Sequence, residues 1–114
     1  MRKIVVTAAL AAMPVTALAH HGWSSYDANS VLTLKGAILE SRYQNPHGEL
    51  VLEDSGKRWL VMLAPVSRME ARGLPREAVA VGKTVTVVGY PSRVTQGEMR
   101  AERITAEGKT VELR

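Results

Sequence analysis

The segment VLTLKGAILESRY, residues 31–43, decides the fold class of this chain. Its β-branched and aliphatic residues suit a pleated strand, and the segment is unusually long for one. Gly36 interrupts it, and a glycine inside a strand usually marks a bulge or a sharp bend. A long first strand that bends is what allows a small sheet to pair with itself and close into a barrel.

The rest of the chain supplies the other elements of such a barrel. A hairpin turn is expected at residues 54–57, and helical composition over residues 66–72 ends at Gly73 and is followed by a second helical turn from Pro75. Further strands are expected at residues 49–53, 58–63, 84–90, 98–106 and 110–113. This order predicts a mainly β fold, a small OB-like antiparallel barrel with one short helix between strands three and four. An open antiparallel meander with the helix on one face is the alternative, and it leaves more exposed edges.

The first nineteen residues have the pattern of a cleavable signal peptide. Arg2 and Lys3 form a positive start, an apolar run follows, and Ala17-Leu18-Ala19 fits a signal-peptidase site. The apolar run is too short to span a bilayer, which takes about 20 residues. We therefore expect a signal peptide at residues 1–19, a lead-in segment at 20–30 and a barrel domain at 31–114. An uncleaved anchor is the less favoured alternative, and the expected location is the periplasm or the exterior, with no membrane span after processing.

The composition limits which chemistry the exported domain can use. The chain has no cysteine, which excludes disulfides, thiolate metal sites and a cysteine nucleophile. Its formal net charge of +4 comes from fifteen basic and eleven acidic residues, and the leader holds two of the basic ones, so the mature charge is +2. That charge, together with export, argues against a nucleic-acid partner.

Four stretches of the sequence resemble one family. They are AHHGWSSYD at residues 19–27, LTLKG at 32–36, NPH at 45–47 and VTVVGY at 85–90. Together they resemble a family of small secreted bacterial proteins that is catalogued as a domain of unknown function. The resemblance implies an exported, all-β single domain, and it supports treating the three histidines as one constellation.

Those histidines are His20, His21 and His47. Cleavage after Ala19 would give His20 a free α-amino group beside its own imidazole, and these two nitrogens can chelate one metal ion. His47 follows Pro46, which restricts the backbone of the turn, and would supply the opposing imidazole. Tetragonal nitrogen sites favour Cu(II). The predicted metal ligands are thus His20 and His47, with His21 as the third candidate.

The sequence therefore predicts an exported metal-binding module, with copper as the expected ion and Asn45 as a residue that orients an imidazole. The alternative is an OB-type module that binds an envelope glycan, a peptide or another ligand without metal. An enzyme is the least favoured class, because no Ser-His-Asp arrangement, Gly-rich phosphate loop or close carboxylate pair is present. An envelope protein or glycan is the expected partner class, and the oligomeric state is left open.

Overall fold

The long first strand, β1 (Leu32–Arg42), belongs to two halves of one sheet. The computed structural model describes residues 22–114, and in it residues 32–37 of β1 pair with β4 (Thr84–Pro91) while residues 37–42 pair with β2 (Glu49–Asp54). The ladder with β2 shifts register between Ile38 and Glu40. β1 thus bends where it changes partner, as the sequence predicts, and the bulge includes Leu39 instead of Gly36.

Gly36 has a different role beside this bend. A Cβ built on it would lie 1.9 Å from the carbonyl oxygen of Glu53, so no side chain fits there without moving the neighbouring strand. The glycine permits the close approach of β2 to β1, and the extra residue of the bulge then falls three positions later.

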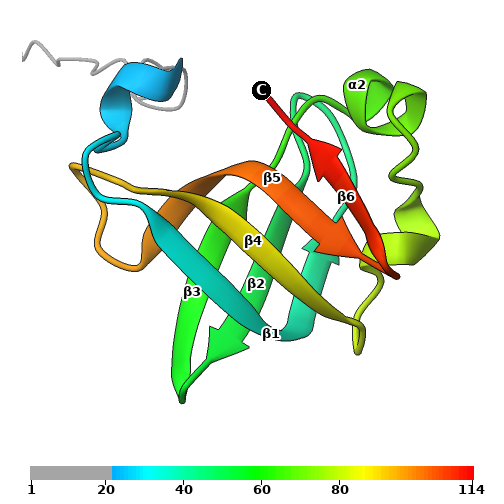
Figure 1. Ribbon diagram of the computed structural model, residues 1–114, viewed down its shortest axis with the longest axis horizontal. Helices are drawn as coiled ribbons and strands as arrows, with labels where there is room; N and C mark the ends of the chain where they lie inside the picture. The colour runs from blue at the N-terminus through cyan, green and yellow to red at the C-terminus, as the bar shows by residue number, and fades with distance from the viewer. Residues whose placement is uncertain (1–21) are drawn as a thin grey trace, which may run out of the picture.

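A parallel pairing closes the barrel. The sheet order is β3-β2-β1-β4-β5-β6, and β3 (Lys57–Met62) also pairs with β5 (Glu98–Ala106). Five strands therefore form a closed barrel, which β6 (Lys109–Glu112) extends beside β5 (Figure 1). The predicted mainly β, OB-like barrel is confirmed, and the open meander is excluded. The closing pair β3–β5 is parallel, however, whereas the sequence predicts antiparallel pairing throughout.

The connection between β3 and β4 carries the predicted helix. Helix α2 (Val66–Ala71) is followed by Gly73 at a φ of +89° and by the 3-10 turn η2 (Arg76–Val79). Gly73 ends the helix because a left-handed residue in this position satisfies the last carbonyls. Among residues 22–114, no helix has the length and apolar character needed to cross a membrane.

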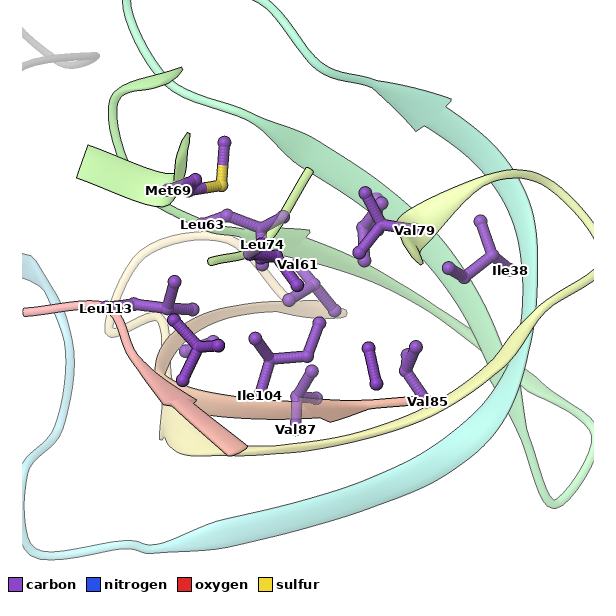
Figure 2. Close-up of a cluster of buried hydrophobic side chains, with 14 of the residues drawn as sticks. Ile38, Val61, Leu63, Met69, Leu74, Val79, Val85, Val87, Ile104 and Leu113 are labelled. Atoms are coloured by element: carbon purple, nitrogen blue, oxygen red, sulfur yellow. The ribbon is translucent and has the colours of Figure 1, made fainter. Parts of the chain in front are cut away.

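The interior of the barrel is filled with aliphatic side chains (Figure 2). Among residues 22–114, no polar or charged residue is buried as a whole. Full burial of each Leu, Ile or Val side chain stabilises the fold by about 1.5–3 kcal/mol. Tyr43 joins this core, and its hydroxyl donates a 2.5 Å hydrogen bond to the carbonyl oxygen of Leu74. The largest fully buried side chains are Ile38, Leu50, Leu52, Val61, Leu63, Met69, Leu74, Val79, Val85, Met99, Ile104 and Leu113.

Candidate functional site

The described part of the lead-in, residues 22–30, packs onto the barrel. It begins with the 3-10 turn η1 (Gly22–Ser25), and Tyr26 then forms an isolated antiparallel bridge with Ser92. The amide of Asp27 donates to the carbonyl of Pro91, and the amide of Arg93 donates to the carbonyl of Ser25, both at 2.9 Å. The lead-in is thus hydrogen-bonded to the connection between β4 and β5, and in Figure 1 it lies at the barrel end where the chain terminates.

Trp23 anchors the lead-in through its indole ring. The guanidinium carbons of Arg100 and Arg114 lie 4.3 Å and 4.4 Å from the ring centroid, within the range of cation–π attraction. The ring of Tyr90 meets it edge-on at 6.1 Å. These contacts attach the lead-in to the body of the barrel.

Tyr26 provides a second anchor. Its hydroxyl donates a 2.5 Å hydrogen bond to Oε2 of Glu98, the first residue of β5. Burial raises the pKa of the Tyr26 hydroxyl well above its ordinary value of 10.0, and the Glu98 carboxylate raises it further. The hydroxyl is therefore a committed donor to Glu98 at neutral pH.

His47 lies in the turn before β2, after the cis peptide bond between Asn45 and Pro46. Its side chain is 26 % exposed, while its Nδ1 is buried and has no hydrogen-bond partner within residues 22–114. Oε2 of Glu49 is 3.9 Å from that nitrogen, and Oε1 of Glu49 accepts a 3.1 Å hydrogen bond from Arg42. The carboxylate beside the imidazole is therefore itself held in place. This neighbour is Glu49; Asn45 is exposed, and its role in orienting an imidazole stays a prediction.

A single row of strand residues connects His47 to the lead-in. Glu49 pairs with Met62 of β3, and Met62 pairs with Arg100 of β5. The guanidinium of Arg100 lies against the ring of Trp23. The Glu49 carboxylate is also close enough to contribute to the raised pKa of Tyr26, after burial and Glu98. His47 and the lead-in thus share one side of the barrel.

Buried polar atoms without hydrogen-bond partners gather around this row. Within residues 22–114 there are four, and natural proteins leave few such groups without an ion, a water or a functional reason. Each belongs to the lead-in or to a residue near it, namely Ser25 Oγ, His47 Nδ1, Arg100 Nε and Glu102 Oε1, of which Glu102 Oε1 forms an ion pair with Nη1 of Arg114 at 3.5 Å. The region that joins the lead-in to the barrel is therefore the candidate functional site.

The structure describes one of the three predicted metal ligands. His47 has the surroundings given above, and His20 and His21 lie outside the described residues, as does the predicted signal peptide. Within residues 22–114, no three His, Asp or Glu side chains come together as a metal-holding group. His47 is the only histidine among residues 22–114, so a second imidazole for a metal ion at His47 would come from outside that range.

Sequence reasoning missed the charged residues of this site, Glu49, Glu98, Arg100 and Arg114. Their signal in the sequence is weak, since Glu98 and Arg100 simply alternate with buried Met99 along a strand. Only the pairing of β3 with β5 brings them beside the row that starts at Glu49.

The structure is a small closed β-barrel of the OB type, and the lead-in, residues 22–30, is hydrogen-bonded to its outer face. The chain belongs to a family of unknown function, DUF6152, whose model matches residues 8–100. The match confirms the resemblance to a family of unknown function that the sequence motifs indicate. No curated protein matches the chain.

Proposed function

We propose that this protein is an exported metal-binding module, with copper as its preferred ion, in which His20 and His47 are the principal ligands. His21 is the third candidate ligand, and the periplasm or the exterior is the proposed location. The observation that carries the proposal is the buried Nδ1 of His47, which has no hydrogen-bond partner among residues 22–114 and faces Glu49.

The surroundings of His47 suit a metal-ligating imidazole. Ligating histidines usually offer one ring nitrogen to the metal and direct the other toward a carboxylate or a carbonyl. The 3.9 Å gap between Nδ1 and Oε2 of Glu49 is short enough to close by a small rotation, and it leaves Nε2 as the nitrogen for the ion. Glu49 would then fix both the tautomer and the orientation of the ring.

The fixed lead-in supports the other half of the proposal. Because consecutive Cα atoms are about 3.8 Å apart, the Cα of His20 can lie no further than about 7 Å from that of Gly22. Gly22 opens the turn that carries Trp23, and Trp23 lies on Arg100 in the row that leads to Glu49. Processing after Ala19 would therefore place a free amine and an imidazole on a segment whose far end is already attached near His47.

The donor set explains the choice of ion. An α-amine and imidazoles form an all-nitrogen set, which suits tetragonal Cu(II), and the affinity order of divalent ions also favours copper over zinc and nickel. The amine has an unperturbed pKa of about 7.7–8.0, so a metal ion can displace its proton near neutral pH.

Competitive Cu(II) titration tests the proposal. The protein with His20 as its authentic first residue is compared with a version that carries one additional alanine before His20, and with His47→Gln. We expect one tight equivalent in the authentic protein and a loss of affinity of at least about tenfold in each of the others. Equal affinity in all three would end the chelate proposal, and chelator-insensitive binding to an envelope glycan would then favour the non-metal alternative.

A further inference from the structure

Four arginines converge at the barrel end that holds the lead-in. Nη1 of Arg68 donates to the carbonyl of Leu113 at 2.9 Å, and Nη1 of Arg72 donates to the carbonyl of Glu112 at 2.8 Å and to the carboxyl group of Arg114 at 3.1 Å. Arg68 of α2 and Arg72, which directly follows α2, therefore lie against residues 112–114. The guanidiniums of Arg100 and Arg114 both lie against the ring of Trp23. We call this group the arginine cluster; it consists of Arg68, Arg72, Arg100 and Arg114.

The arginine cluster has too few anionic partners. Among residues 22–114, the side-chain carboxylate within 4.0 Å of its guanidiniums is that of Glu102, whose Oε1 is 3.5 Å from Nη1 of Arg114. Arg68 and Arg72 donate to the backbone carbonyls of Leu113 and Glu112, and Arg72 also donates to the carboxyl group of Arg114, the last residue described. The nearby Glu98 carboxylate is already engaged by the Tyr26 hydroxyl. Four positive charges are thus paired directly with two carboxylates.

Arg100 shows this imbalance most clearly. It is partly buried, and its Nε is shielded from solvent and has no hydrogen-bond partner among residues 22–114. Burial lowers the pKa of this guanidinium, and the neighbouring Arg68 and Arg114 lower it further. A partly buried guanidinium normally has a carboxylate or several carbonyls as acceptors, and the cost of leaving its donors unpaired is high.

We propose that the arginine cluster is a binding site for one small oxyanion, a carboxylate or phosphate group, with Arg100 and Arg114 as its principal donors. A guanidinium offers paired N–H groups that match two oxygens of a carboxylate or phosphate, and Arg is the preferred residue for such contacts. Trp23 adjoins the site, because the guanidiniums of Arg100 and Arg114 both lie against its ring. None of the four arginines is a ligand in the proposed metal centre, so the two proposals stand or fall separately.

The fluorescence of Trp23 can report on the oxyanion. A processed, metal-free chain with Trp59→Phe keeps Trp23 as its only tryptophan and is titrated with sodium phosphate and, separately, with sodium acetate. Each titration is compared with sodium chloride at the same ionic strength. We expect a saturable fluorescence change with at least one of the two oxyanions that chloride does not produce.

Variants assign the signal to the cluster. Arg100→Gln is expected to weaken the apparent affinity at least tenfold, whereas Arg76→Gln is expected to leave it unchanged. Arg76 is the matched control, because its guanidinium also lies on an aromatic ring, 5.0 Å from the centroid of Tyr43, and it is not a member of the cluster. Should Arg100→Gln fail to fold, Arg114→Gln makes the same test from a side chain that is 54 % exposed.

Each outcome decides the proposal. A response to phosphate alone assigns a phosphate site, a response to acetate alone assigns a carboxylate site, and a response to both assigns a general oxyanion site. No saturable response to either beyond that of chloride, in protein shown to be folded by circular dichroism, overturns the proposal. Equal affinity in the parent chain and in a folded arginine variant also overturns it.

Discussion

The hydroxyl of Tyr26 donates a 2.5 Å hydrogen bond to Oε2 of Glu98, and this bond joins the segment before the barrel to the first residue of β5. The bond spans 72 positions of sequence. Together with the contacts of Trp23, it fixes the path of the chain just after the proposed metal-binding terminus. The stability of the lead-in is therefore tied directly to the proposed function.

Replacing Tyr26 by phenylalanine removes this bond and leaves the Glu98 oxygen without its donor. Hydrogen bonds to charged groups contribute about 1.5–3 kcal/mol, and partial exposure of Tyr26 places the expected loss near the low end. We expect the free energy of unfolding at pH 7, measured with urea, to fall by about 1–2 kcal/mol. An unchanged free energy would show that the bond does not contribute to folding.

The same residue predicts a loss of stability in alkali. The folded-state pKa of Tyr26 is raised above the unfolded value of 10.0 by burial and by Glu98, so the stabilisation is complete below pH 10. Above pH 10 the unfolded chain releases the Tyr26 proton while the folded chain retains it, and stability falls as the pH rises. Urea unfolding between pH 9 and pH 11 should show a steeper decline for the natural chain than for Tyr26→Phe. Parallel declines would contradict the prediction, since the other tyrosines are common to both proteins.

Substituting alanine for Gly36 should damage the bend of β1. The added Cβ would meet the Glu53 carbonyl oxygen at 1.9 Å, and both strands would have to separate to relieve the overlap. We expect a loss of about 3 kcal/mol or more, at the upper end of overpacking effects, in thermal or urea unfolding. Gly108→Ala is the control, because that glycine has a φ of +78° with no atom within 4 Å of the new Cβ, and it should cost about 1 kcal/mol. Similar losses for the two variants would mean that the approach of β2 to β1 is not restricted as described.

Trp23→Ala should release the lead-in while leaving the barrel folded. Its two cation–π contacts and its edge contact with Tyr90 contribute together about 2 kcal/mol, and Trp23 is not a member of the core. We expect the Asp27 amide, which donates to Pro91, to exchange with deuterium at least tenfold faster, while the free energy of global unfolding falls by no more than about 2 kcal/mol. Trp59→Ala, in the β2–β3 hairpin, should leave that amide unaffected. If Trp23→Ala leaves the exchange rate unchanged, the indole does not hold the lead-in.

Glu49→Gln tests whether the carboxylate beside His47 supports metal binding. Loss of an outer carboxylate partner typically weakens metal affinity about 10–100-fold, and we expect Cu(II) affinity to fall within that range. Glu53→Gln, an exposed position on the same strand, should have no effect on affinity in the same competitive titration. Equal affinities for Glu49→Gln and the natural chain would remove Glu49 from the proposed centre.

Local patterns made most of the fold predictable. Alternation along the strands, the hairpin at Ser55 and Gly56 with φ values of 55° and 80°, and the helix stop at Gly73 are all properties of short segments. The strand and helix order then restricts the topology to very few arrangements. The parallel pairing of β3 with β5 could not be predicted, because it joins residues 38 positions apart, Leu60 with Glu98, and no local pattern encodes it.

The site was less predictable for the same reason. His47 could be chosen from its residue type and its turn, but its partner Glu49 could not be separated from other strand carboxylates. Arg100 has the sequence pattern of an ordinary surface residue. Its long-range neighbour is Trp23, from the other end of the chain, which lies on its guanidinium.

Pulsed electron paramagnetic resonance tests the central proposal most directly, because the echo modulation of bound Cu(II) reveals how many imidazoles coordinate it. The processed protein, loaded with one equivalent of copper, is predicted to show at least two coordinated imidazoles and to lose one of them in His47→Gln. An identical modulation pattern in the two proteins would contradict the account, because copper would then bind without His47.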